Sequence, residues 1–263
     1  MKPADRTFVI SGACSGLGLA TVRDLHSEGA YIALLDLNED AGAEIVKELG
    51  DRVKFFECDV SETSSVTKAV HGAAEWIKTT GKPMGGVVAA AGVGGAQKIV
   101  DGRTGEPIPI EAIDFILNIN IRGTLDLVRL CMAHLVKVTP TSPDGERGVL
   151  ILVASSAAFD GQPGQVAYAA SKGAIASLTL PLARDVARYG VRVVTIAPSL
   201  FESRMTAVLP EKARKSLERV MEFPVRAGKP EEFASLVRQG VENLMLNGTV
   251  LRLDGAMRMP SKM

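Results

Sequence analysis

A tyrosine and a lysine that share one helical face carry the clearest chemistry in this sequence. Tyr168 and Lys172 stand four residues apart at the start of a segment rich in Ala, Ile and Leu, and this spacing places both side chains on one face of a helix. A phenol with a pKa of about 10 is a poor acid or base near neutral pH unless a nearby cation stabilises the phenolate. Ser155, thirteen residues upstream, is placed to hydrogen-bond the same substrate oxygen. Alone, the Tyr-x-x-x-Lys pattern is more often an ordinary solvated helix face, so the argument needs a partner motif.

The segment before this pair is predicted to position it. Val149 to Val153 is an apolar run typical of a strand buried on both faces, and it breaks at Ser155 into a loop that contains Gly and Pro. The helix that carries Tyr168 is predicted to continue to Tyr189. Ser155 therefore lies where a buried strand ends.

A glycine-rich motif near the start of the chain is the partner. A short strand, Thr7 to Ile10, is followed by Gly12, Gly16 and Gly18 and then by a helical pattern from Leu19 to Ser27. Such glycines let backbone N–H groups at a helix start approach a pyrophosphate, whose charge the helix dipole favours. Three glycines also make a simple tight turn, but the order of strand, turn and helix favours a nucleotide. The expected contacts are Gly12, Ser15, Gly16, Leu17 and Gly18.

An acidic residue ends the second predicted strand. Tyr31 to Leu35 delivers Asp36 at its carboxyl end, about twenty residues beyond the glycines, where a carboxylate holds a ribose diol and repels a 2′-phosphate. The glycine loop carries no Arg or Lys to attract that phosphate, so the sequence predicts NAD rather than NADP. The alternative for Asp36 is the start of a turn or a cap for the helix after Asn38.

The other segments continue the alternation of strand and helix. Further strands are predicted at 53–58, 87–90, 192–197 and 249–253, and further helices at 61–79 with Ser61 as the cap, 111–138 and 230–243. This alternation predicts an α/β fold, a single-domain Rossmann-type doubly wound parallel sheet of about seven strands with helices on both faces. Ligands of such sheets bind at the carboxyl ends of the strands, which is where these residues fall: Gly12, Asp36, Asp59, Ala90, Ser155 and Pro198.

Composition narrows the class of protein. The 263 residues are 46% hydrophobic, and 30 basic residues balance 30 acidic ones, so no nucleic acid or anionic membrane surface is expected as a partner. The cysteines, Cys14, Cys58 and Cys131, are odd in number and widely spaced, which argues against disulfides and a metal site and favours a reducing compartment. No membrane span or signal sequence is expected. The expected location is the cytoplasm or the mitochondrial matrix.

An amphipathic segment near the carboxyl end is a candidate lid. Residues 199–224 mix apolar side chains with Arg204, Lys212 and other basic residues, and the segment is predicted to cover the substrate. For the basic residues, a solvated helix face is favoured over phosphate binding.

Taken together, these motifs resemble the short-chain dehydrogenase/reductase family over essentially the whole chain. The resemblance rests on the glycine loop, Asp36, Asp59-Val60, Asn120, Ser155 and Tyr168-x-x-x-Lys172 in register. It implies that Tyr168 is the general acid and base, that Lys172 lowers its pKa and holds the ribose, that Ser155 fixes the substrate oxygen, and that Asn120 supports a proton relay through water. Further cofactor contacts are implied at Val60, Ala90, Gly92, Pro198, Phe201 and Ser203.

Within that family, the segments 157–187 and 250–260 are similar to the type-2 3-hydroxyacyl-CoA dehydrogenases. This similarity implies an NAD-dependent homotetramer that acts on short 3-hydroxyacyl-CoAs or hydroxysteroids. Ala90 replaces the usual Asn after the fourth strand, and Ser199 replaces the usual Gly after Pro198, so substrate identity stays open. The alternatives are a ketoreductase of specialised metabolism and a non-catalytic scaffold of the same fold.

Overall fold

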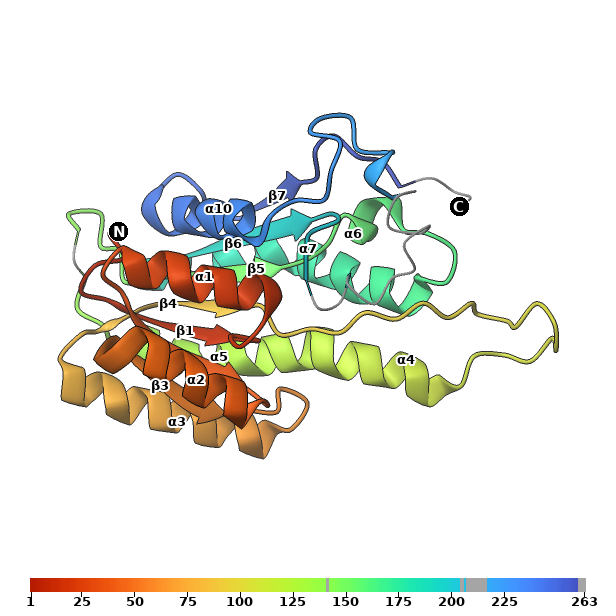
Figure 1. Ribbon diagram of the computed structural model, residues 1–263. Helices are drawn as coiled ribbons and strands as arrows, with labels where there is room; N and C mark the ends of the chain where they lie inside the picture. The colour runs from red at the N-terminus through yellow and green to blue at the C-terminus, as the bar shows by residue number, and fades with distance from the viewer. Residues whose placement is uncertain (141, 204–205, 207–216, 260–263) are drawn as a thin grey trace.

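Parallel strands form the sheet on which the molecule is built. The computed structural model describes residues 1–140, 142–203, 206 and 217–259. The strands are β1 (Thr7–Ser11), β2 (Tyr31–Asp36), β3 (Val53–Glu57), β4 (Met84–Ala89), β5 (Gly148–Val153), β6 (Val191–Pro198) and β7 (Thr249–Leu253). They form a seven-stranded sheet in the order β3-β2-β1-β4-β5-β6-β7, and every neighbouring pair is parallel (Figure 1). This arrangement confirms the predicted doubly wound α/β fold.

Helices cover both faces of the sheet because successive strand residues point to opposite sides. The described helices are α1 (Gly16–Ser27), α2 (Glu39–Leu49), α3 (Thr63–Thr80), α4 (Ile110–Leu117), α5 (Thr124–Leu135), α6 (Ala157–Asp160), α7 (Val166–Val186) and α10 (Pro230–Glu242), with short 3₁₀ turns at Gly50–Arg52 and Ala187–Tyr189. Val9 and Leu150 pack in one core with residues of α3, α5 and α7, whereas Ile10 and Ile151 pack in the other with residues of α1, α2 and α10.

The helix predicted at 111–138 is interrupted near its middle, at the turn that contains Asn120. Between α4 and α5 the chain forms a π-helical segment, Asn118–Gly123, which contains Asn120. Such wide turns often mark functional sites. The hydrophobic pattern predicts the helix but not the extra residue in its turn.

Two other predictions needed correction. The fourth strand begins at Met84 rather than Val87, because its glycines allow a close approach of strands: a Cβ at Gly86 would lie 2.4 Å from the carbonyl oxygen of Val149. Ser61 does not cap α3, whose N-cap position is Glu62. The Ser61 hydroxyl instead donates to Asp59 Oδ1 at 2.6 Å.

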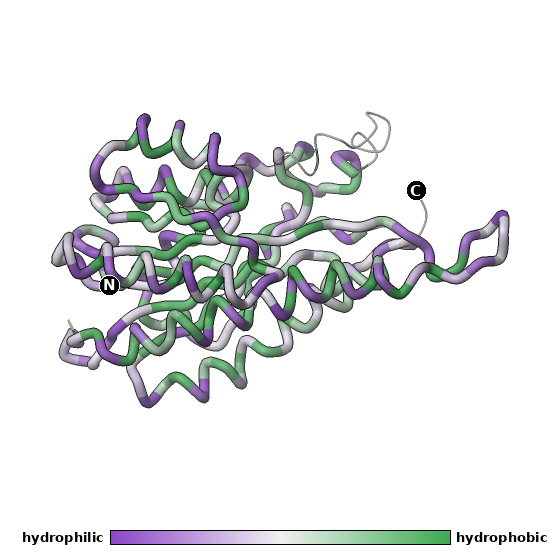
Figure 2. The backbone as a smooth tube through the Cα atoms, turned by 90° about the horizontal axis from the view of Figure 1, so that it is seen from below, coloured by the Kyte–Doolittle hydropathy of each residue, from purple (hydrophilic) through white to green (hydrophobic). Residues whose placement is uncertain are grey.

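The segment between β4 and α4 extends away from the sheet alongside α4 (Figure 1). An isolated bridge between Val100 and Pro107 closes its tip, which is largely hydrophilic (Figure 2). Of the predicted lid, residues 204–205 and 207–216 lie outside the described part of the chain. In the described part, Leu217 and Met221 are buried and Phe223 is exposed.

Candidate active site

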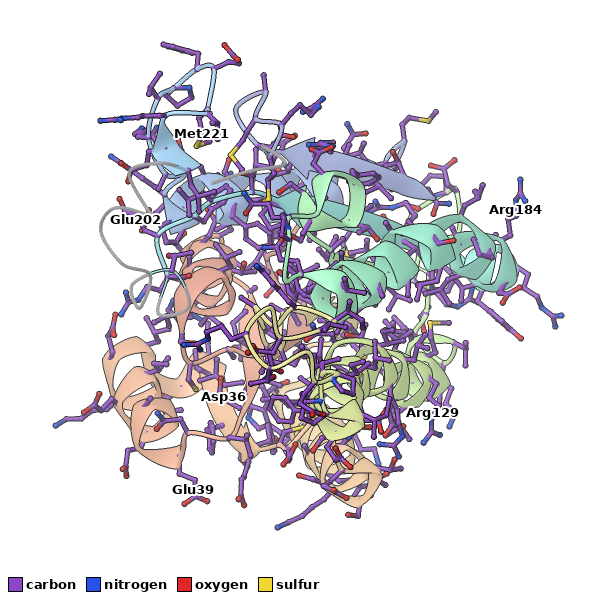
Figure 3. All side chains as sticks on the ribbon, turned by 90° about the vertical axis from the view of Figure 1, so that its right-hand side faces the viewer. Asp36, Glu39, Arg129, Arg184, Glu202 and Met221 are labelled. Atoms are coloured by element: carbon purple, nitrogen blue, oxygen red, sulfur yellow. The ribbon has the colours of Figure 1, made fainter. Side chains whose placement is uncertain are left out.

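One pocket lies at the carboxyl ends of the strands, the edge that Figure 3 views. It has a volume of about 200 Å³ and brings together most of the predicted site. The predicted residues that line it are Gly12, Ser15, Gly16, Leu17, Gly18, Ala90, Gly92, Ser155, Tyr168, Lys172, Pro198, Phe201 and Ser203. Asp36, Asp59, Val60 and Asn120 do not line this pocket.

Ser155 and Tyr168 are brought together by β5, α6 and α7. Ser155 follows the end of β5 by two residues, and its Oγ accepts the backbone N–H of Ala157 at 3.2 Å, where α6 begins. Tyr168 lies in the first turn of α7 and forms a hydrogen bond with the Ser155 side chain. Two hydroxyls therefore meet at one wall of the pocket, an arrangement suited to holding a single substrate oxygen.

Lys172 lies one helical turn after Tyr168 and is buried. Its Nζ donates to the carbonyl oxygen of Val153 at 2.9 Å and lies 5.9 Å from the centroid of the Tyr168 ring. Burial lowers the pKa of Lys172 to about 8. A Cβ placed on Gly92 would be 3.4 Å from this nitrogen, so the absence of a side chain at Gly92 keeps the ammonium accessible from the pocket.

Two opposing effects act on the pKa of Tyr168. Burial raises the pKa of Tyr168, and the hydrogen bond from Ser155 opposes that rise. The ammonium of Lys172 lies over the Tyr168 ring and donates to the Val153 carbonyl, and the expected lowering of the Tyr168 pKa by this cation stays a prediction. Because Tyr168 is half-buried at the pocket wall, nearby charges and dipoles as well as solvent influence its ionisation.

Asn120 lies under the pocket wall in the π-helical segment. Its Oδ1 accepts the N–H of Val93 at 2.8 Å, and its Nδ2 donates to the Val93 carbonyl at 2.9 Å and to Ser171 Oγ at 3.0 Å. Both amide protons are thus used to hold the loop after β4 and the start of α7. The side chain has a structural task here, and its predicted part in a proton relay stays a prediction.

The glycine loop is shaped by close backbone contacts. Gly12 has a φ of +64°, and a Cβ there would lie 2.9 Å from Ala91 Cα. A Cβ on Gly18 would lie 2.0 Å from the Gly12 carbonyl oxygen. The Ser15 side chain forms no cap hydrogen bond, and the first turn of α1 carries no acidic residue. The first N–H groups of α1 are therefore left to bind an anion in the pocket.

Asp36 ends β2 at the edge of the sheet that Figure 3 views. Its Oδ2 accepts the N–H of Cys14 at 2.9 Å, and its Oδ1 accepts the N–H of Asn38 at 3.1 Å. Asn38, rather than Asp36, caps α2 by accepting the N–H of Ala41. Asp36 thus joins the glycine loop to the end of β2.

Asp59 and Val60 form a turn that supports the π-helical segment. Asp59 Oδ1 accepts from the backbone N–H and the hydroxyl of Ser61. A Cβ on Gly123 would lie 2.6 Å from the Val60 carbonyl oxygen, so Gly123 allows the two segments to pack closely.

The pocket is also lined by residues that were not named individually as site residues: Ala91, Val93, Val153, Ala154, Ser199 and Thr206. Thr206 Oγ1 donates to the Phe201 carbonyl at 2.6 Å and accepts the N–H of Ser203 at 3.0 Å. The Ser-x-x-Thr spacing was the available signal for this turn. After Ala90, which replaces the usual Asn, the N–H of Ala91 donates to Ser11 Oγ at 3.2 Å.

Among the described residues, no three metal-ligating side chains gather at one place, and no described helix combines the length and apolar character needed to cross a bilayer.

Known proteins share both the sequence and the fold. The chain is 43% identical over 251 residues to the type-2 3-hydroxyacyl-CoA dehydrogenase of Drosophila melanogaster, covering 95% of this chain and 96% of that protein. It is 42% identical over 251 residues to the human enzyme of that name, covering 95% and 94%. A crystal structure of the type-2 3-hydroxyacyl-CoA dehydrogenase from Mycobacterium avium superposes with a TM-score of 0.91 at 36% identity and 98% coverage of both chains. Residues 6–214 match the family described as short chain dehydrogenase, and the chain therefore belongs to this family of oxidoreductases.

Proposed function

We propose that this oxidoreductase interconverts a short 3-hydroxyacyl-CoA and the matching 3-ketoacyl-CoA with NAD. The observation that carries the proposal is that Ser155, Tyr168 and Lys172 line the same pocket as the glycine loop. The similar proteins named 3-hydroxyacyl-CoA dehydrogenase support the substrate class. The proposal includes a homotetramer in the cytoplasm or the mitochondrial matrix.

The residues present fit a nicotinamide dinucleotide. A Cβ at Gly12 or Gly18 would overlap the backbone of Ala91 or of Gly12, so the glycines allow the loop to pack tightly against the start of α1, whose first turn offers N–H groups to the pyrophosphate. Asp36 would hold the adenosine ribose, and Lys172 would hold the ribose next to nicotinamide. When bound, nicotinamide supplies the carbon that accepts or gives the hydride.

In this proposal, Tyr168 transfers the proton at the substrate oxygen and Ser155 donates a hydrogen bond to that oxygen. In alcohol oxidation, Tyr168 Oη takes the hydroxyl proton while the Ser155 hydroxyl donates to the same oxygen. In ketone reduction, Tyr168 returns that proton. Lys172 supplies positive charge beside the ring, so the phenolate that forms during oxidation has a cation 5.9 Å from the ring centroid.

The proposed reaction is tested with acetoacetyl-CoA and with NADH and NADPH in parallel. We expect NADH to be preferred at least about ten-fold in kcat/KM, because the Asp36 carboxylate repels a 2′-phosphate and a hydrogen bond to a charged group is worth about 1.5–3 kcal/mol. Asp36→Asn keeps an acceptor for the Cys14 N–H and should narrow this preference. Glu39→Gln, which removes a nearby exposed carboxylate at the start of α2 (Figure 3), is the control and should leave the preference unchanged.

Two outcomes would contradict parts of this proposal. If a steroid or another ketone oxidises NADH and acetoacetyl-CoA does not, the acyl-CoA assignment is wrong and the reaction class stands. If Asp36→Asn and Glu39→Gln behave alike, Asp36 does not select the cofactor.

The pH dependence should differ between the two directions. Oxidation needs Tyr168 as a base, and burial raises its pKa, so kcat/KM for alcohol oxidation should increase with pH through neutral and alkaline values. Reduction needs the protonated phenol, so its kcat/KM should stay level near neutral pH. Lys172→Met removes the cation that favours the phenolate and should shift the oxidation profile to higher pH, whereas exposed Lys78→Met should not. A Lys172→Met profile that matches the wild type would exclude this role.

A further inference from the structure

An arginine on the last strand connects elements that are distant in sequence. Arg252 of β7 forms an ion pair with Asp160, the last residue of α6, through Nη2, and its Nε donates to Asp254 Oδ2 at 2.6 Å. The same Nη2 donates to the Met257 carbonyl at 3.2 Å, and the guanidinium carbon lies 5.1 Å from the centroid of the Phe159 ring. The Arg252 side chain is 23% exposed, and those of Asp160 and Asp254 are 19% and 10% exposed. Water screens such an ion pair less than one on the open surface.

The ion pair between Arg252 and Asp160 holds α6, the short helix that orients the Ser155 hydroxyl. α6 comprises only Ala157–Asp160, and the N–H of Ala157 donates to Ser155 Oγ. At its other end, the N–H of Asp160 donates to the Ser156 carbonyl at 2.9 Å. A four-residue helix has few internal hydrogen bonds of its own. Its position, and with it the orientation of the Ser155 hydroxyl, therefore depends on outside contacts such as the one to Arg252.

The turn that Arg252 holds also contacts a second residue of the pocket wall. Ser199, which lines the pocket, donates its hydroxyl to Met257 Sδ at 3.3 Å. The N–H groups of Glu222 and Phe223 donate to the Gly255 carbonyl at 3.1 and 3.3 Å. The turn at Asp254–Met257 thus joins two segments that flank the undescribed part of the predicted lid.

We propose that Arg252 is a positioning residue for the reaction. Through Asp160 it fixes α6 and the Ser155 hydroxyl relative to Tyr168, and through Asp254 and Met257 it fixes the Ser199 wall of the pocket. One planar guanidinium bridges both carboxylates, which a lysine ammonium does not do in the same geometry. This inference rests on the proposed role of Ser155 at the substrate oxygen.

The test compares Arg252→Gln, Arg252→Lys, Asp160→Asn and the double variant Arg252→Gln/Asp160→Asn in steady-state reduction of acetoacetyl-CoA. We expect Arg252→Gln to lower kcat by about ten-fold, since a small misplacement of a reacting group costs one to two powers of ten. The KM for NADH should change less than about two-fold, because the glycine loop is not touched. Arg252→Lys should lie between the wild type and Arg252→Gln. The double variant should be no worse than the more affected single variant, because both changes break one contact.

The matched control is Arg23→Gln, which breaks an exposed ion pair with Glu48 on the outside of α1 and α2 and should leave kcat unchanged.

The pH profile of alcohol oxidation is a second readout. Weakening the Ser155 hydrogen bond that opposes the rise in the pKa of Tyr168 should shift the oxidation profile of Arg252→Gln to higher pH. If Arg252→Gln fails to fold, Asp160→Asn tests the same contact with Arg252 still bound to Asp254.

Three results would overturn the inference. The first is a kcat per folded enzyme that is equal in Arg252→Gln and Arg23→Gln, and the second is a double variant in which the effects of Arg252→Gln and Asp160→Asn multiply. The third is a rise in the KM for NADH of Arg252→Gln that is as large as its loss in kcat. The wild type run alongside separates this inference from the proposed substrate. If the wild type does not reduce acetoacetyl-CoA, the substrate proposal fails, and the variants are compared with a ketone that it does reduce.

Discussion

Tyr168→Phe is expected to lower turnover by about two to four powers of ten, the usual contribution of a positioned general acid or base. The change removes one oxygen atom and keeps the ring that packs beside Lys172. The residual rate should no longer depend on pH through this residue. Steady-state reduction of acetoacetyl-CoA measures the loss, and NADH fluorescence titration should give an affinity close to that of the wild type.

Tyr189→Phe is the matched control for this prediction. Tyr189 ends the 3₁₀ turn after α7, where Arg188 lies over its ring at 4.9 Å, and it does not line the pocket. The same chemical change at this position should leave kcat unchanged. Turnover by Tyr168→Phe at the level of Tyr189→Phe would show that another group transfers the proton.

The sequence could predict the sheet because the signal for it is local. Each buried strand is a short apolar run, each helix has its own amphipathic period, and alternating such segments fold in few ways. The helical spacing of Tyr168 and Lys172 and the strand that ends before Ser155 likewise follow from neighbouring residues. The shared pocket follows because parallel strands present their carboxyl ends at one edge.

The features that were missed depend on contacts between distant segments. Lys172 donates to Val153 on β5, so the direction of its ammonium is set by a strand that precedes it by nineteen residues. The partners of Arg252 come from α6 and from the turn after β7. Ser61 has the residue type of a helix cap, but the carboxylate of Asp59 competes for its hydroxyl. No local periodicity encodes such pairings.

Gly18→Ala is expected to have the second largest effect, a loss of NADH affinity of about a hundred-fold. The added Cβ would lie 2.0 Å from the Gly12 carbonyl oxygen and 2.8 Å from its carbon, so the backbone of the loop or the start of α1 must move. Overpacking of this kind costs about 1–3 kcal/mol or more, and each 1.4 kcal/mol or so is a factor of ten in affinity. The N–H groups that face the pyrophosphate are on the segment that moves. Fluorescence titration with NADH gives the affinity, and thermal unfolding without NADH shows how much of the cost falls on the fold.

Gly173→Ala makes the same change in a helix where there is room for it. Gly173 lies in α7 beside Lys172, and the nearest atom to an added Cβ is the Ala158 carbonyl oxygen at 4.0 Å. Alanine in a helix is favoured over glycine by about 0.5–1 kcal/mol, so this variant should unfold at a slightly higher temperature and bind NADH as the wild type does. The pair therefore separates a general effect of replacing a helical glycine from the specific overlap at Gly12. If both variants bind NADH equally well, the close contact between Gly18 and Gly12 does not shape the dinucleotide site.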